Sequence, residues 1–94
     1  MDFSSVHNHH EHGVFQAVLD LSKSYPEIAR NEEWLIDVAC LALNRVTPRY
    51  IRHQADFHFY LTDKERNEHA RTVNTAVREA FEFVRARAGG VPAN

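Results

Sequence analysis

The sequence has few of the residues from which catalytic and metal centres are commonly built. Its single cysteine, Cys40, can form neither an internal disulfide nor a multi-cysteine zinc site. Cys40 lies in an apolar segment, where we expect an inert thiol packed in the core. No glycine-rich phosphate loop, nucleophile elbow or HExxH motif is present. These absences argue against an enzyme and give no reason to expect a cofactor.

The sequence also has no large excess of positive or negative charge and no long apolar run. Eleven Lys and Arg stand against thirteen Asp and Glu, a balance that argues against non-specific binding of long nucleic acid. No apolar run could cross a bilayer, and the N-terminus lacks the basic and apolar regions of a secretion signal. We therefore expect a cytoplasmic protein without a membrane partner.

The length of 94 residues predicts a single domain over residues 1–94, with an ordered core at about 8–87 and a loose tail at 88–94. A domain of this size buries only about 60–65% of the surface of its unfolded chain. A second copy that covers more apolar area would stabilise it, so we expect a homodimer.

Helical spacing of apolar residues predicts a first helix over about 8–24, with Asn8 as N-cap and Glu11 three residues on. Pro26 should end this helix or open the next turn. A second helix is expected over about 31–46, with Asn31 as N-cap. Apolar residues occupy almost every face of this helix, which predicts a helix buried on all sides.

Two short extended pieces, 49–53 and 57–61, are rich in aromatic and β-branched residues and could form a hairpin or a pair of strands that completes a dimer. Thr62 and Glu65 form a capping box for a third helix that runs to about Arg87. The sequence thus predicts a mainly α, compact domain of three to four helices with a short extended or β segment around residues 49–61.

An apolar stripe with spacings of three and four runs along the third helix from Ala70. Phe83 lies off this stripe, and Ala76 lies one heptad earlier on the same secondary face. Phe83 could wrap the edge of the core, or it could form a subunit contact. The sequence leaves these two alternatives open.

The most informative segment reads D-V-A-C-L-A-L-N-R-V-T-P-R-Y, from Asp37 to Tyr50. Asp37 and Asn44 are seven residues apart and therefore share one helical face. Pro48 stops the helix, and arginines and a tyrosine surround it. A plain core helix needs none of these polar groups, so the segment predicts a polar seam.

This segment resembles the signature of the late competence development protein ComFB family, which has an acid, a small apolar A-L-N-R run, a Pro and a Tyr at this spacing. The upstream segment N-H-H-E-H-G-V-F-Q-A-V is similar to the family's first helix. The resemblance extends from about Asn8 to Arg87. Two departures are Thr47, where many members have a second Pro, and the absence of the zinc-binding cysteines of some relatives.

The resemblance implies a small cytosolic bacterial dimer that is not an enzyme and, as in cyanobacterial relatives, a receptor for cyclic dinucleotides such as cyclic di-GMP or cyclic di-AMP. The alternative is a protein-interaction or scaffold dimer without nucleotide binding, linked to competence or pilus function. Where the chain matches the motif, the implied ligand-binding residues are Asp37, Asn44, Arg45, Arg49 and Tyr50.

The chemistry of these residues suits such a ligand. Arg45 and Arg49 could form forked hydrogen bonds to phosphates or to a guanine Hoogsteen edge. Asp37 could accept from the guanine N1–H and N2–H, and Asn44 could both donate and accept. Tyr50 offers a flat ring on which a base could stack.

Each of these residues also has a structural alternative. Asp37 could be a buried carboxylate paired with Arg45 or with an arginine of a partner subunit. Asn44 could bond the last carbonyls of the helix. Arg49 could be a solvated charge at a strand edge, and Tyr50 could belong to the core or to an interface.

Seven histidines form the last notable group: His7, His9, His10, His12, His53, His58 and His69. His9 and His12 have the i, i+3 spacing that can hold a transition metal, although a zinc site needs a third ligand and a fixed second shell. We expect a surface histidine patch and no native metal. Protonated histidines are unfavourable near a positive helix N-terminus, so mild acid should loosen this end.

Overall fold

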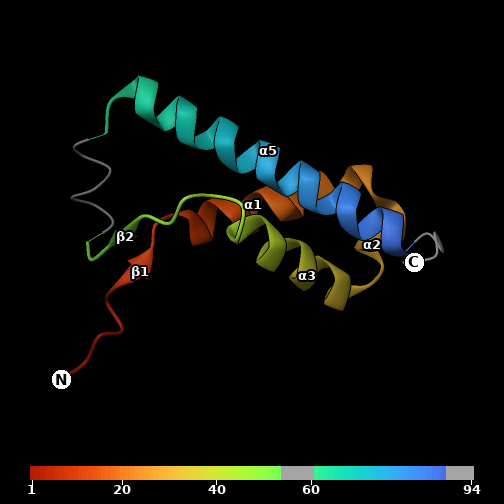
Figure 1. Cartoon of the computed structure of the whole chain (residues 1–94), viewed down its shortest axis with the longest axis horizontal. Helices are drawn as coiled ribbons and strands as arrows, with labels where there is room; N and C mark the ends of the chain where they lie inside the picture. The colour runs from red at the N-terminus through yellow and green to blue at the C-terminus, as the bar shows by residue number, and fades with distance from the viewer. Residues whose placement is uncertain (54–60, 89–94) are drawn as a thin grey trace.

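The computed structural model describes residues 1–53 and 61–88, which form helices and one short two-stranded sheet (Figure 1). The predicted mainly α fold, with three to four helices and a short extended segment, is confirmed within these ranges. The elements in chain order are β1 (His7–Asn8), α1 (His10–Leu21), the 3-10 turn η1 (Ser22–Ser24), α2 (Pro26–Ala29), α3 (Glu32–Leu43), β2 (Tyr50–Ile51) and α5 (Asp63–Ala88).

Helix α1 begins two residues later than expected, because Asn8 belongs to β1 and does not cap the helix at the N-cap position. The helix ends at Leu21 and passes into the 3-10 turn. Pro26 then opens α2 at its first position, where the missing N–H of proline costs no hydrogen bond. Just before it, the buried ring of Tyr25 stacks on Phe81 of α5 at a centroid distance of 4.5 Å.

Helix α3 has the predicted cap. The side-chain oxygen of Asn31 accepts from the backbone N–H groups of Glu33 at 3.0 Å and Trp34 at 3.3 Å. These bonds satisfy two of the donors that the first turn of a helix leaves open. The helix ends at Leu43, three residues before the predicted end at Val46.

The prediction that α3 is buried on all sides is wrong. Only Val38 and Ala42 of this helix are fully buried, while 55% of Ile36 is exposed and Cys40 is exposed too. Val38 and Ala42 are four residues apart and face the core together, whereas Cys40 lies two residues from each and points to the opposite side. Cys40 is therefore not a core side chain, because the described elements pack against one side of α3.

The extended piece predicted at 49–53 contains β2, whereas the piece predicted at 57–61 lies outside the described residues except for Leu61, which is buried. A pairing of these two pieces therefore stays a prediction. Strand β2 pairs with β1, antiparallel, and thereby joins the start of α1 to the chain that follows α3. The register places His7 opposite Ile51 and Asn8 opposite Tyr50.

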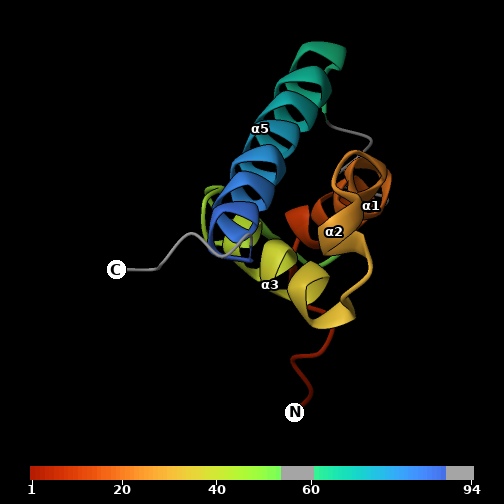
Figure 2. The same cartoon turned by 90° about the vertical axis from the view of Figure 1, so that its right-hand side faces the viewer.

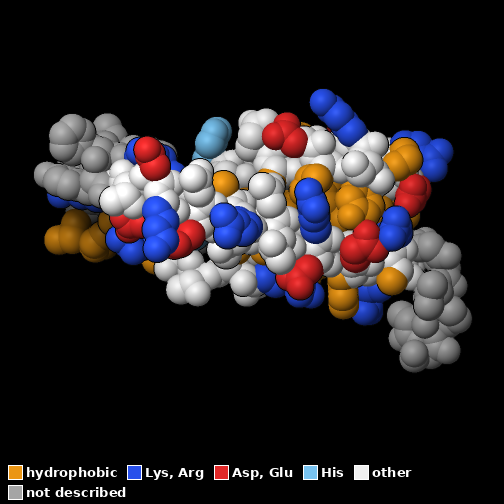
Figure 3. Space-filling model, turned by 90° about the horizontal axis from the view of Figure 1, so that it is seen from above, with side chains coloured by type: hydrophobic (Ala, Val, Ile, Leu, Met, Phe, Trp, Pro, Cys, Tyr) orange, Lys and Arg blue, Asp and Glu red, His pale blue; other side chains and the backbone are white. Residues whose placement is uncertain are grey.

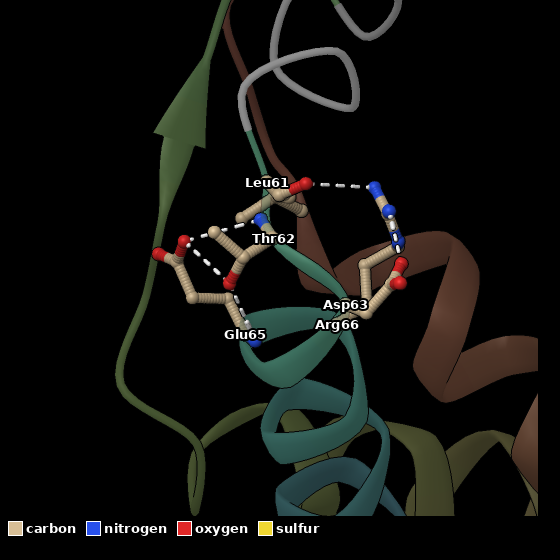
Figure 4. Close-up of polar contacts among 5 residues, drawn as sticks. All are labelled: Leu61, Thr62, Asp63, Glu65 and Arg66. Carbon is tan, nitrogen blue, oxygen red and sulfur yellow. Dashed lines mark hydrogen bonds and ion pairs between the residues drawn. The ribbon is translucent and has the colours of Figure 1, made fainter.

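The predicted capping box at the start of α5 is confirmed (Figure 4). The backbone N–H of Glu65 donates to the hydroxyl of Thr62 at 3.1 Å, and the carboxylate of Glu65 accepts from the backbone N–H of Thr62 at 3.2 Å. Arg66 adds a bond to the carbonyl of Leu61 at 2.9 Å and an ion pair with Asp63 at 2.6 Å. Helix α5 therefore has a fixed beginning.

Helix α5 packs mainly on α3 and α1, with α1, α2 and α3 gathered on one side of it (Figure 2). Its inward residues include Val77 and Phe81, both fully buried. Ala76, which lies one heptad before Phe83 on this helix, is buried in the core, whereas Phe83 is 41% exposed. Ala70, predicted in the stripe, is exposed.

Candidate functional site

Asp37 lies on α3 with its side chain at the surface. It contributes to a groove of about 440 Å³ between α3 and the C-terminal part of α5. The exposed position rules out the alternative of a buried carboxylate paired with Arg45, because Arg45 makes its ion pair with Glu79 of α5, at 3.9 Å. The groove is lined by Trp34, Asp37, Cys40, Leu41, Phe83, Val84 and Arg87.

Most of this groove is apolar. Phe83 forms one wall, and the guanidinium of Arg87 lies over its ring at 5.1 Å from the centroid. Two charged side chains of opposite sign line the groove, the carboxylate of Asp37 and the guanidinium of Arg87. Seen from the side of α5, apolar side chains come to the surface toward the C-terminal end of that helix (Figure 3). A planar or apolar group could therefore lie in the groove beside a carboxylate.

Asn44 follows the last residue of α3 and folds back on the helix. Its side-chain nitrogen donates to the backbone carbonyl of Cys40 at 3.0 Å. The structural alternative, in which Asn44 bonds a carbonyl of the helix end, is confirmed. The pair of Arg45 and Glu79 is exposed on both sides, so it contributes at most about 1 kcal/mol to stability.

Arg49 and Tyr50 lie on the far side of Pro48, where the chain is fixed to the start of α1. The backbone N–H of Arg49 donates to the side-chain oxygen of Asn8 at 3.1 Å, and its carbonyl accepts from the N–H of His9 at 2.6 Å. Tyr50 is 67% exposed, so within the protomer it is not a core residue. The exposed side chain of Arg49 agrees with a solvated edge position.

Asn8 is the residue whose role in this site the sequence did not reveal. It is only 8% exposed, and the same side-chain oxygen also accepts from the backbone N–H of His10 at 3.2 Å. One carboxamide therefore binds both the first residue of α1 and Arg49, 41 positions away in the sequence. An asparagine at a helix start signals the first of these bonds but gives no indication of the second.

Three imidazole rings meet behind this junction. The ring centroids are 5.3 Å apart for His9 and His10, 5.8 Å for His9 and His69, and 5.3 Å for His10 and His69. We call His9, His10 and His69 the histidine cluster. The predicted partner of His9 was His12, which is exposed and makes none of these ring contacts. The third member comes from α5, outside the N-terminal group.

His10 is the most enclosed member of the histidine cluster, with 8% of its surface exposed. Burial lowers the pKa of His10 below its ordinary value of 6.5, and the nearby positive charges of His69 and Arg49 lower it further. The neutral imidazole is therefore the form that the fold favours. Within residues 1–53 and 61–88, no group of three or more His, Cys, Asp or Glu side chains is arranged to hold a metal ion.

The histidine cluster borders a second groove, of about 420 Å³, between α1 and the N-terminal half of α5. Its other polar lining groups include Gln16, Asp20, Arg66 and Asn74. None of the five predicted ligand residues lines this groove, and only Asp37 lines the first one. Within one protomer these residues thus occupy three places: the α3–α5 groove, the end of α3, and the β1–β2 sheet.

Comparison with known proteins gives one match. The model of the family described as late competence development protein ComFB matches residues 7–88, from the first residue of β1 to the last residue of α5. This match confirms the resemblance noted in the sequence and has nearly the same bounds. No curated protein and no solved structure matches the chain. None of the helices in the described ranges has the length and apolarity that a membrane crossing requires.

Proposed function

Because the chain belongs to the late competence development protein ComFB family, we propose that it is a non-enzymatic cytoplasmic signalling protein that binds a cyclic dinucleotide, cyclic di-GMP or cyclic di-AMP, as a homodimer. The proposed ligand contacts are the residues that match the family's central motif. They are Asp37, Asn44, Arg45, Arg49 and Tyr50.

The observation that carries this proposal is the position of Arg49 and Tyr50. Their backbone is held in an extended conformation by β1 and by the side chain of Asn8. Both side chains are nevertheless exposed, and Tyr50 is 67% exposed. A guanidinium beside a flat ring, on a segment whose backbone is already ordered, suits a phosphate next to a stacked base. Little backbone entropy would be lost on binding.

Asp37 supports the guanine-binding part of the proposal. Its carboxylate is exposed at the edge of an apolar groove, where Phe83 and Trp34 offer apolar and aromatic surface. A carboxylate beside such a surface could accept from the N1–H and N2–H of a base that lies against the ring. Adenine lacks this pair of donors, so Asp37 favours cyclic di-GMP over cyclic di-AMP.

The dimer is proposed for two reasons. A single protomer leaves apolar side chains exposed, and it keeps the proposed ligand residues apart from one another. Phe83 is 41% exposed on α5 and lines the groove that contains Asp37, and Ile36 is 55% exposed on α3. A second copy that covers both the groove and the exposed side of α3 would bury both side chains. It would also bring a second set of arginines near the first, as a ligand with two phosphates requires.

The alternative is a scaffold dimer without nucleotide binding. The internal partners of two motif residues favour it: Asn44 bonds the carbonyl of Cys40, and Arg45 pairs with Glu79. Under this alternative the motif only shapes the end of α3 and the interface. The two proposals differ in one observable, the heat of ligand binding.

Isothermal titration with cyclic di-GMP, cyclic di-AMP and GTP distinguishes the two proposals. We expect saturable binding of a cyclic dinucleotide, weakened about tenfold or more in Asp37→Ala and in Arg49→Ala, because a hydrogen bond to a charged group contributes roughly 1.5–3 kcal/mol. Arg30→Ala is the matched control, since Arg30 is an exposed arginine at the end of α2. No heat from a folded dimer would refute the receptor; unchanged affinity in both variants would refute the site.

Sedimentation or light scattering tests the dimer separately. Ile36→Glu and Phe83→Glu should convert the dimer to monomer, because each places a charge in the proposed interface. Leu19→Glu is the matched control, since Leu19 is an equally exposed apolar residue on α1. A wild-type monomer at high concentration, or dissociation in Leu19→Glu alone, would contradict the proposed interface.

A further inference from the structure

The junction between β1, β2 and α1 is short. Each strand has two residues, and the side chain of Asn8 and the bond between His9 and Arg49 join the strands to the start of α1. Arg49 and Tyr50 are exposed in this segment, whereas α3 and α5 are held by a continuous apolar core. A short and largely exposed segment opens at a lower free energy than the core does. A change in charge at this place would therefore affect the junction first.

The residues that make this junction are also those of the histidine cluster. His9 donates its backbone N–H to the Arg49 carbonyl, and His10 donates its own to the side chain of Asn8. Their rings meet each other and that of His69 at centroid distances of 5.3–5.8 Å. Protonation would place like charges at these distances, at the positive N-terminus of α1. Separation of β2 from α1 would relieve the repulsion.

We propose that the histidine cluster is a proton-sensitive latch, which holds Arg49 and Tyr50 against β1 and the start of α1 while its imidazoles are neutral and releases them on protonation. The latch concerns the folded chain alone. Only its consequence for ligand affinity, a loss of binding in acid, rests on the proposed function.

The charged neighbours of the histidine cluster are of both signs. Arg49 approaches from the segment that contains β2 and Arg66 from α5, but Arg66 is already paired with Asp63. Glu65 of α5 is the negative group: the positive charges of His69 and Arg49 help to lower its pKa, and its carboxylate is engaged in the capping box. Other titratable groups on the adjoining elements include His7, Glu11, His12 and Asp20, with Tyr50 on β2 and Lys64, Glu68 and Arg71 on α5.

The direction of the pH effect follows from His10. Its pKa in the folded protein is below the ordinary value of 6.5, so the opened junction binds more protons than the closed one as pH falls below 6.5. The closed junction is therefore fully favoured above 6.5 and loses stability as pH falls toward the lowered pKa. One linked proton changes such an equilibrium by up to about tenfold per pH unit.

Hydrogen exchange of the full chain between about pH 8 and pH 5 tests the latch, with rates expressed as protection factors. In wild type, protection of residues 7–10 and 49–51 should fall about tenfold or more, while protection of α3 stays constant. His10→Gln and His69→Gln should reduce this dependence on pH, and His12→Gln, the matched control on α1, should keep it. Constant protection in wild type, or full pH dependence in both cluster variants, would overturn the proposal.

A titration of the imidazoles by NMR keeps the test decisive if a glutamine variant does not fold. His10 should titrate below 6.5 in wild type, and Arg49→Gln should raise its pKa because a neighbouring positive charge is removed. A His10 that titrates at or above 6.5, or that does not respond to Arg49→Gln, would overturn the latch. Cyclic dinucleotide binding measured at pH 8 does not depend on either result, so the latch and the receptor can fail separately.

Discussion

Replacement of Asn8 by alanine should destabilise the protein strongly, because one buried side-chain oxygen serves two separate backbone donors. The N–H of His10 is buried, and leaving this donor without its acceptor would lower the free energy of unfolding by about 1–3 kcal/mol. The N–H of Arg49 is partly buried, and the loss of its bond would cost about 0.5–1.5 kcal/mol. We expect a total of about 1.5–4.5 kcal/mol, a large part of the roughly 5–15 kcal/mol that stabilises a typical domain.

Urea denaturation at fixed protein concentration measures this effect, since the stability of the proposed dimer would depend on concentration. Asn44→Ala is the matched control: it removes the same side chain from an exposed position with a bond to one carbonyl, and should cost less than about 1 kcal/mol. Asn8→Asp keeps the acceptor and should recover part of the stability at neutral pH. Equal losses in Asn8→Ala and Asn44→Ala would refute the role assigned to Asn8.

Three further changes test the packing and the helix caps. Asn31→Ala removes the acceptor of two N–H groups at the start of α3 and should lower the free energy of unfolding by about 1 kcal/mol in urea; no change would contradict the cap. Phe81→Ala empties a fully buried site and should cost roughly 3–5 kcal/mol by the same assay; a loss below 1 kcal/mol would show that the core is placed wrongly. The hydrogen bonds of Thr62 lower the pKa of Glu65 below 4.5, so stability from this carboxylate is complete above 4.5 and is lost as pH falls through the lowered value. Thr62→Ala removes the hydroxyl bond to this carboxylate but keeps the backbone N–H, so it should reduce, and not abolish, the decline of the urea midpoint between about pH 5 and pH 3; an unchanged decline would contradict this assignment.

The parts of the fold that follow from local chemistry were predictable from the sequence. Asn31, Pro26 and the pair of Thr62 and Glu65 act on backbone groups within four residues of themselves, so their effects do not depend on the rest of the chain. The spacing of Val77 and Phe81 likewise marks the buried side of α5.

The parts that depend on distant contacts were not predictable. Nothing near Asn8 indicates that its side chain also binds Arg49, so the sequence placed it at a helix start and missed β1. The exposure of Cys40 depends on which elements cover α3, and an apolar residue pattern alone cannot indicate that one side stays open. The histidine cluster needed His69 from a helix far along the chain.

The candidate site was predicted as a list of residues and not as an arrangement. Asp37 and Tyr50 are exposed, as ligand residues must be, but the five residues are distributed over three places in one protomer. Spacing along a helix shows which side chains share a face; it does not show which faces of two copies meet. The dimer is therefore the part of the proposal on which the shape of the pocket depends.

Titration of cyclic di-GMP into the folded wild-type protein is the most direct test of the central claim. The account predicts saturable heat at about pH 8, above the ordinary histidine pKa of about 6.5, and a loss of at least about tenfold in affinity in Arg49→Ala but not in Arg30→Ala. The absence of heat for cyclic di-GMP and cyclic di-AMP, from a protein shown to be folded and dimeric, would contradict it.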